Sequence, residues 1–290
     1  MTPPDDAKDA ETLKQILFPL TPLQGQLILA LPESRVPGRY CAINAVRHLN
    51  RAWKIKDHDL EMTALRCITA EEESAKAIFH ALRASRYEGA ERLGLKSHVH
   101  KMALITFLRA VNNFLAETLE KSPVYDIKMR LEKATRRLSI SFCMRGIDGY
   151  RLNPDPPLHF SSTVNEEHPN FRRQMDVFVK ASAARAGESL EKYLQEQAQL
   201  REKLLYAPNE GLNHFSGDVE KVCTESQQKV FRNLIFYLLI DQHAEQQGFV
   251  QQCLNAFVEM VTTNKKVAAA AEAEARAGDA ALSDSSSTKE

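Results

Sequence analysis

The chain has 290 residues, of which 43% are hydrophobic, and Lys plus Arg equal Asp plus Glu at 38 each. This length and composition are typical of a globular protein with a sizeable core, in one large domain or two modest ones. The balanced charge excludes a global field that would draw the chain onto nucleic acid or a membrane surface.

The first 38 residues predict a proline-rich N-terminal arm. Prolines at positions 3, 4, 19, 22, 32 and 37 break up any long helix. A short apolar helix around Leu13–Leu20, or a strand at Leu27–Leu31, would dock the arm on the body. The acidic start is unlike a signal peptide, and no apolar run approaches the roughly 20 residues that span a bilayer. We therefore expect a soluble, cytoplasmic protein that makes no membrane contact.

Residues 39–160 predict a helical domain. Apolar residues recur at helical spacing over 39–53, 58–87 and 97–120, with almost no Pro or Gly inside these ranges. Ser97 is placed to cap the third of these helices, because a Ser hydroxyl accepts a hydrogen bond from the free N–H groups of a first turn.

After these three helices the sequence becomes rich in basic residues, and then in Gly, Pro and Asn. A fourth helix is predicted over 125–138, and basic residues recur along it, which favours a solvated face. These are Arg130, Lys133, Arg136 and Arg137. The hexapeptide at 139–144 is predicted to be extended. The Gly-, Pro- and Asn-rich stretch 145–162 is predicted to be a loop.

The remaining chain predicts a C-terminal helical region at 161–265 that packs on the first domain, followed by a disordered Ser/Thr-rich tail at 266–290. The elements of this region are helices at 169–186 and 188–205, a loop at 208–218, and a long, interrupted helix at 218–262. The fold class that results is all-α: a helical bundle with additional C-terminal helices and very little strand.

Five scattered cysteines limit the possible chemistry. None lies within four residues of another, which excludes a CxxC redox motif and a zinc knuckle. They are Cys41, Cys67, Cys143, Cys223 and Cys253. We expect reduced, buried thiols, and the sequence predicts neither a metal site nor a cofactor.

Acidic residues of the second helix lie on faces that should be buried. On a helical wheel Glu71 falls in the middle of the apolar stripe, Glu72 beside it and Lys76 at its edge, while Glu73 points away from it. An unpaired buried carboxylate is very costly, so these groups need partners.

The third helix carries matching groups in its first turn. His98, His100 and Lys101 lie there, where cations oppose the helix macrodipole unless an anion compensates. The connection 88–96 is short enough for the two helices to be antiparallel neighbours. We therefore expect acidic groups of the second helix to meet His98, His100 or Lys101.

Arg92 and His98 are suited to RNA cleavage if they lie close together. A histidine acts as general acid or base near neutral pH, and an arginine holds the scissile phosphate through two hydrogen bonds. The 2′-hydroxyl is the nucleophile of that reaction, which therefore requires no metal. The alternative is structural: an EExxK pattern is usually a solvated, ion-paired face, and a first-turn histidine is more often a cap or a packing residue.

The sequence resembles AbiV-type abortive-infection proteins at these residues. EESAK at 72–76 resembles their EExxK motif, although Gly is usual where Ala75 stands, and HVHK at 98–101 resembles the HxxK element that follows. The stretch 141–157 is similar to their short extended segment and proline-bearing loop. The resemblance covers about residues 40–160. It implies a HEPN-superfamily helical bundle, and many HEPN proteins are metal-independent RNases whose dimers pair Arg and His across the interface.

The resemblance therefore implies a phage-defence RNase that binds RNA and forms a homodimer. Arg92 and His98 would be catalytic, and a supporting ion network would include Glu71, Glu72, Glu73, Lys76, His100 and Lys101. Two alternatives remain open. One is a non-catalytic helical protein that binds or regulates a partner, and the other is an enzyme controlled by a protein inhibitor or activator.

Overall fold

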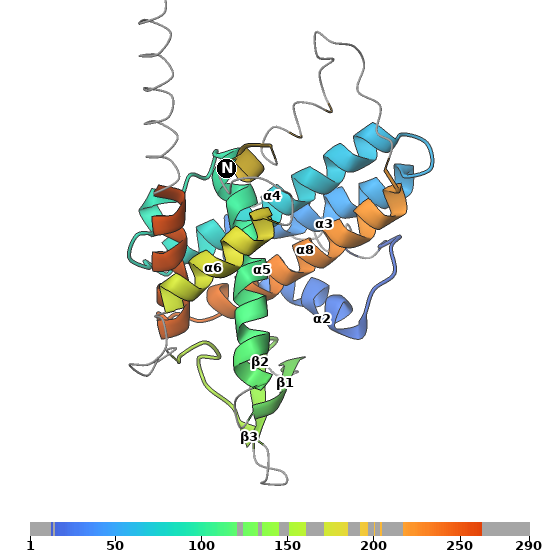
Figure 1. The fold of residues 1–290 in the computed structure, drawn as a ribbon. Helices are drawn as coiled ribbons and strands as arrows, with labels where there is room; N and C mark the ends of the chain where they lie inside the picture. Colours follow the sequence, from blue (N-terminus) through green and yellow to red (C-terminus); the bar gives the residue numbers. More distant parts are fainter. Residues whose placement is uncertain are drawn as a thin grey trace, which may run out of the picture.

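The computed structural model describes residues 13, 15–120, 124–132, 135–144, 151–160, 171–184, 192–196, 200, 204 and 217–262. Over these residues the chain is mostly helical, with a small three-stranded sheet at one end (Figure 1). The fold class is therefore confirmed as largely helical, with the addition of this sheet.

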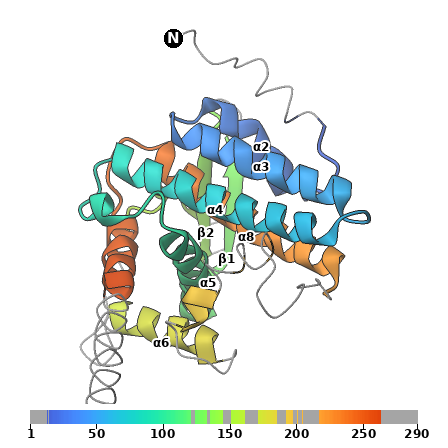
Figure 2. The ribbon, with the colours of Figure 1, turned by 90° about the horizontal axis from the view of Figure 1, so that it is seen from above.

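The helix α4 (Leu60–Ala84) lies at the centre of the fold, side by side with α3 (Gly38–Ile55) and α8 (Val219–Asp241) (Figures 1 and 2). No residue of α4 before Ala84 is fully exposed. Many of its buried positions are alanines, and such small side chains allow neighbouring helices to approach closely. The helices predicted at 39–53 and 58–87 are confirmed, with ends shifted by one to three residues.

The N-terminal arm docks through the helix α2 (Pro22–Ala30), which the 3-10 turn η1 (Leu31–Glu33) continues. Thr21 caps α2 with a reciprocal pair of hydrogen bonds to Gln24, and proline occupies the first helical position. The predictions of a helix at Leu13–Leu20 and a strand at Leu27–Leu31 are therefore wrong, because the capping residues start a helix between those two segments.

The helix α5 (His98–Glu120) crosses the α3, α4 and α8 layer steeply (Figures 1 and 2) and runs toward the sheet. The helix α6 (Phe171–Ala184) packs on it, with Phe171 edge-on to Phe114 at a ring-centroid distance of 5.1 Å. The helices predicted at 97–120 and 169–186 are thus confirmed.

The sheet replaces the helix predicted over 125–138, which is wrong. The strands β1 (Val124–Leu131), β2 (Leu138–Met144) and β3 (Arg151–Leu152) pair antiparallel in that order. Ile127 and Met129 alternate with the exposed Lys128 and Arg130, which is the period of a strand and not of a helix. The extended segment predicted at 139–144 is confirmed as β2.

The long helix predicted at 218–262 is interrupted, as expected. After α8 the chain passes through non-helical residues 242–247 and forms a last helix at 248–262. Gln247 is fully buried at this break and joins two distant segments to the end of α8. Its backbone N–H donates to the Tyr87 hydroxyl, its side-chain oxygen accepts from Leu158 N–H, and its side-chain nitrogen donates to the Leu239 carbonyl.

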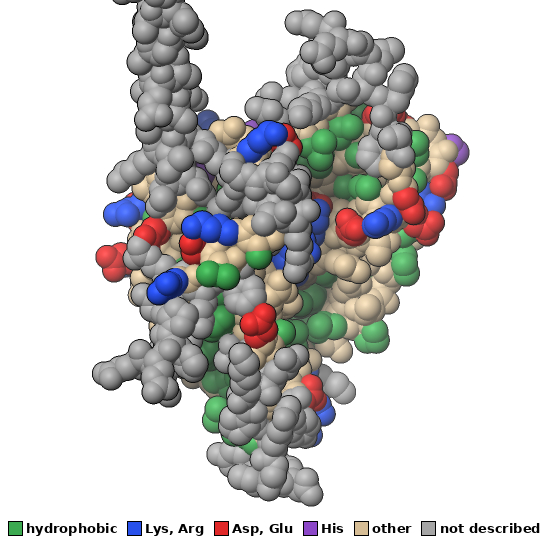
Figure 3. All heavy atoms as spheres, in the orientation of Figure 1, with side chains coloured by type: hydrophobic (Ala, Val, Ile, Leu, Met, Phe, Trp, Pro, Cys, Tyr) green, Lys and Arg blue, Asp and Glu red, His purple; other side chains and the backbone are tan. Residues whose placement is uncertain are grey.

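A continuous cluster of buried apolar side chains extends from Phe18 to Val261. Aromatic rings join its parts, with Phe257 of the last helix 5.4 Å from Phe107 and 6.3 Å from Phe79 between ring centroids. All five cysteines are free thiols, and four of them are buried. On the face drawn in Figure 3, charged side chains of both signs are interspersed.

Several predictions fall largely outside the described residues. The helix predicted at 188–205 is described only at 192–196, 200 and 204, where it is helical. Residues 145–150, most of the loop 208–218 and the tail 266–290 are not described. None of the helices in the described ranges combines the length and the apolar character needed to cross a bilayer.

Candidate functional site

The acidic residue Glu72 of α4 meets two residues of the first turn of α5. Its Oε1 lies 2.6 Å from Nδ1 of His98, and its Oε2 accepts a hydrogen bond of 2.9 Å from Nζ of Lys101. The contact expected between the second and third helices is thus confirmed. The side chains of Glu72 and Lys101 are 5% and 8% exposed, whereas that of His98 is 40% exposed.

The geometry determines which nitrogen of His98 is available for chemistry. An ionised carboxylate only accepts hydrogen bonds, so the proton on the side facing Glu72 belongs to Nδ1. In the neutral ring Nε2 is then the free acceptor. A buried carboxylate that orients an imidazole in this way also stabilises the imidazolium formed when Nε2 takes up a proton. Lys101 balances the charge of Glu72, which reduces the cost of burying it.

The turn before α5 holds His98 in place. The Ser97 hydroxyl accepts from His100 N–H at 3.2 Å, which confirms Ser97 as the cap of this helix. The Nδ1 of His100 accepts a hydrogen bond of 3.0 Å from Gly94 N–H. A Cβ on Gly94 would lie 2.7 Å from that of Ser97, so the turn leaves room only for glycine.

The neighbouring acid Glu71 points to another helix. Its carboxylate accepts hydrogen bonds of 3.1 and 3.3 Å from Nζ of Lys229 in α8. Ser74 also contacts α8, because the side chain of Asn233 donates to its hydroxyl at 2.9 Å. Glu71 therefore belongs to the packing of α4 on α8 and is not part of the pair formed with His98.

Glu73 and Lys76 form a separate, half-buried pair with a distance of 3.7 Å between Oε1 and Nζ. Glu73 points off the apolar stripe but not into open solvent, since it also contacts Cys41 of α3. Burial, and next the negative charge of Glu73, raise the pKa of the Cys41 thiol to about 11. This thiol is therefore protonated at neutral pH and is not a nucleophile.

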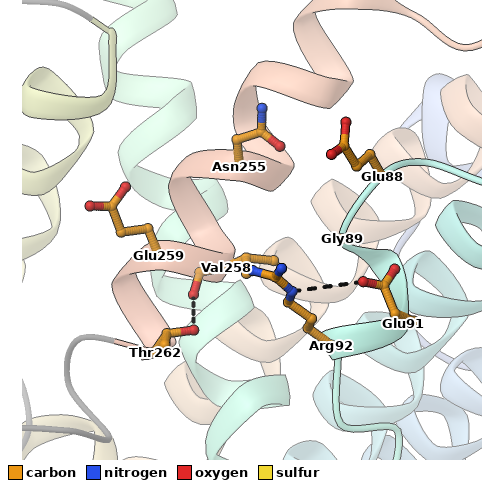
Figure 4. Close-up of a pocket in the computed structure, with 8 residues that line it drawn as sticks. All are labelled: Glu88, Gly89, Glu91, Arg92, Asn255, Val258, Glu259 and Thr262. Atoms are coloured by element: carbon orange, nitrogen blue, oxygen red, sulfur yellow. Dashed lines mark hydrogen bonds and ion pairs between the residues drawn. The ribbon is translucent and has the colours of Figure 1, made fainter.

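Arg92 lies at the end of the 3-10 turn η2 (Ala90–Arg92), with its side chain 69% exposed and its Nε 3.7 Å from Glu91. It borders an open pocket of about 590 Å³ against the last helix (Figure 4). The other residues lining this pocket are Glu88, Gly89, Glu91, Asn255, Val258, Glu259 and Thr262. No hydrogen bond or ion pair joins Arg92 to His98 over the residues that the structure describes.

The sequence reasoning missed Arg83, which positions the segment that carries Arg92. Its guanidinium donates to the carbonyls of Ala90, Glu91 and Leu93 at 3.2, 3.2 and 2.5 Å. The signal was present, because polar residues follow one another along α4 at spacings of three and four. They are Arg66, Thr69, Glu73, Lys76, His80 and Arg83.

Across the described ranges, no three His, Cys, Asp or Glu side chains are grouped in a way that could hold a metal ion.

Comparison of the chain with protein-family models, with curated proteins and with solved structures finds no match. The resemblance to AbiV-type proteins therefore stays a prediction that rests on the motifs alone.

Proposed function

We propose that this protein is a metal-independent endoribonuclease of the abortive-infection type, with a HEPN-like helical core, in which His98 is the general acid and base. One observation carries the proposal. The buried carboxylate of Glu72 lies 2.6 Å from Nδ1 of His98, while the ring is 40% exposed and leaves Nε2 for proton transfer.

The reaction follows from the chemistry of RNA. Nε2 of His98 takes the proton of a 2′-hydroxyl, and the 2′-oxygen forms a bond to the adjacent phosphorus. The bond from phosphorus to the 5′-oxygen breaks, and that oxygen takes a proton from the imidazolium. The products are a 2′,3′-cyclic phosphate and a 5′-hydroxyl. Glu72 orients the ring and stabilises its charged form throughout.

Arg92 would hold the phosphate and stabilise its developing charge. Within one chain it does not contact His98, so the composite site takes Arg92 from a second copy in a two-fold dimer. The exposure of Arg92 supports this arrangement. Val99, an apolar residue directly after His98, is 39% exposed and fits a contact between the copies.

Cleavage of a labelled RNA in the presence of EDTA tests the role of His98. We expect His98→Ala to lower the rate by at least about 100-fold, since general acid–base catalysis contributes that much or more. His159→Ala is the matched control, because His159 is exposed and, among the described residues, forms a hydrogen bond through its backbone alone. Equal cleavage by the wild type and His98→Ala would show that His98 is not catalytic.

Co-expression of two inactive variants tests the composite site. A dimer of one His98→Ala chain and one Arg92→Ala chain contains one intact site and one doubly defective site. With random pairing half of the dimers are mixed, so we expect about a quarter of wild-type activity. No activity above that of the separate variants would refute the assembly of the site across a dimer.

A second candidate is a non-catalytic protein that binds or regulates a partner. It is favoured by the completeness of the ion network, since both oxygens of Glu72 are occupied and Lys101 is almost fully buried. It predicts that His98→Ala lowers the melting temperature and removes no RNA cleavage. Co-purification of an inhibitor or activator from the native cell would identify such a partner.

A further inference from the structure

The helices α3 and α4 lie side by side (Figure 2), and three arginines of this pair of helices lie around His48. Arg47 and Arg51 are four residues apart and so share one face of α3. Arg66 of α4 reaches the same face, with its Nη1 3.4 Å from Nδ1 of His48. Arg47, His48 and Arg66 are half-buried, and Arg51 is exposed. These four residues are called the α3–α4 cluster below.

The positive charges of the α3–α4 cluster are only partly offset among the described residues, where the charge of Glu73 also acts on His48. Over the described residues, no carboxylate forms an ion pair with Arg47, Arg51 or Arg66. Arg35 pairs with Asp241, Arg92 with Glu91 and Arg136 with Glu33, whereas Arg109 and Arg232 also form no carboxylate ion pair among the described residues. The cluster differs from these in bringing three arginines to one histidine. Like charges held together repel one another, so the cluster is complementary to a bound anion.

His48 is neutral and adds a donor to this cluster. Burial, and after it the charges of Arg66, Arg51 and Arg47, lower its pKa to about 4. An arginine has no acceptor, so Nδ1 must accept from Arg66 and the proton of the neutral ring lies on Nε2. The cluster therefore offers only hydrogen-bond donors, which is the arrangement that recognises phosphate oxygens.

The cluster and the His98 site share the helix α4. Arg66 and Glu72 are six residues apart on it, which corresponds to about 9 Å along the helix axis and about 120° around it. The half-buried pair Glu73 and Lys76 occupies the same side of α4. A single strand bound at the cluster would therefore follow the surface of the molecule around α4 to reach His98.

We propose that the α3–α4 cluster binds the phosphate backbone of single-stranded RNA and directs the strand toward His98. The choice of RNA as ligand rests on the proposed function, whereas binding to the cluster does not depend on cleavage. Phosphate contacts position a strand without reading its sequence, so the cluster sets where RNA lies and not which bases are cut.

Fluorescence anisotropy with a short, labelled, 2′-O-methylated oligouridine tests this proposal. The probe lacks the nucleophilic hydroxyl, so its binding is measured without cleavage. We expect the triple variant Arg47→Gln, Arg51→Gln, Arg66→Gln to raise Kd at least tenfold at about 0.15 M salt. The slope of log Kd against log salt should fall by about 2, since each contact to single strands contributes about 0.7.

The matched control removes three positive charges elsewhere. Arg130, Arg137 and Arg151 are exposed residues of the sheet region, and their triple change to Gln should leave Kd within about twofold. Equal losses in both triple variants would show a general charge effect and overturn the proposal. Failure of the wild type to bind the probe would also overturn it. Displacement of the probe by pyrophosphate at equal phosphate concentration would assign the cluster to small phosphates instead of RNA.

Two further variants complete the test. His98→Ala distinguishes failure of this proposal from failure of the proposed function, and Arg51→Gln replaces the triple variant if that variant does not fold. His98→Ala should bind the probe like the wild type. If it also cleaves RNA as fast as the wild type, the proposed function fails and the cluster still stands. If the triple variant does not melt cooperatively, Arg51→Gln alone replaces it, because Arg51 is exposed. We expect that single change to lower the salt slope by about 0.7, and an unchanged slope would contradict the proposal.

Discussion

Glu71 and Glu72 are adjacent in the sequence, yet they attach α4 to different helices. Successive side chains on a helix point about 100° apart, so neighbouring residues face different partners. Glu71 pairs with Lys229 of α8, and Glu72 pairs with His98 and Lys101 of α5. The same two acids therefore fix both the packing of α4 and the orientation of the histidine proposed for catalysis.

The pairing of Glu72 with Lys101 makes a prediction about stability. Glu72→Gln leaves the ammonium of Lys101 buried without a counter-ion, so we expect the free energy of unfolding to fall by about 3 kcal/mol. Adding Lys101→Met removes that buried charge and should recover most of the loss. Urea unfolding at pH 7 measures both changes. Additive losses in the double variant would show that the two side chains are not coupled in this way.

The sequence predicted which way these side chains point from their helices, but it did not predict several of the residues that they contact. Helical wheels placed Glu72 and the first turn of α5 on facing sides, and the structure bears this out. Lys229 is 158 residues from Glu71, and no local pattern connects them. The polar spacing along α4 indicated the face on which Arg83 lies but not its acceptors, because these are backbone carbonyls that every residue possesses. The wheels predict which way a side chain points and not what lies there.

At the scale of elements, the long helices were predicted well and the short elements poorly. The apolar pattern of α3, α4 and α5 repeats over many turns, so its period is unambiguous. In β1 the residues Ile127 and Leu131 are four apart, which fits a helix as well as a strand. Pairing with β2 decides the outcome, since Leu131 lies opposite Leu138 and satisfies backbone groups that a helix would satisfy internally.

Close helix packing at Gly38 supplies a prediction at this scale. A Cβ on Gly38 would lie 2.9 Å from Cε2 of Tyr237 and 3.4 Å from the carbonyl oxygen of Ala77, where α3, α4 and α8 converge. We expect Gly38→Ala to lower the free energy of unfolding by about 1–3 kcal/mol through overpacking. Chemical denaturation measures this effect.

Gly25 provides the matched control for this substitution. It lies inside α2, and an added Cβ would meet nothing within 4 Å. Gly25→Ala should therefore raise stability by about 0.5–1 kcal/mol, as expected for alanine in place of glycine within a helix. Similar effects at both positions would argue against close packing at Gly38.

At the scale of the whole molecule, the core combines residues from both ends of the chain. Tyr237 of α8 and Phe257 of the last helix are almost fully buried, and both contact residues that precede position 160. The hydrophobic cluster includes these late residues together with Phe18 and Phe79. The predicted boundary between 39–160 and 161–265 thus separates segments that share apolar surface.

This shared surface predicts that a fragment of residues 1–160 does not fold alone. Without α8 and the last helix, the faces of α4 and α5 that contact them would be exposed to water, and that burial is a main source of stability. We expect the fragment to lack the cooperative thermal transition of the full chain in circular dichroism. A sharp transition in the isolated fragment would instead support an independent domain at 39–160.

The sequence by itself determined the helical class of the protein, the positions of its long helices and the meeting of an acidic group of the second helix with the first turn of the third. These features depend on periodicity and on the cost of unpaired buried charge, both of which act over short stretches of chain. Only the tertiary structure decided that residues 124–131 form a strand, that Glu71 pairs with α8, and that Arg47, Arg51 and Arg66 converge around His48. Those outcomes depend on which segments meet in space, because a pairing or a shared charge cluster has no signature within either segment alone.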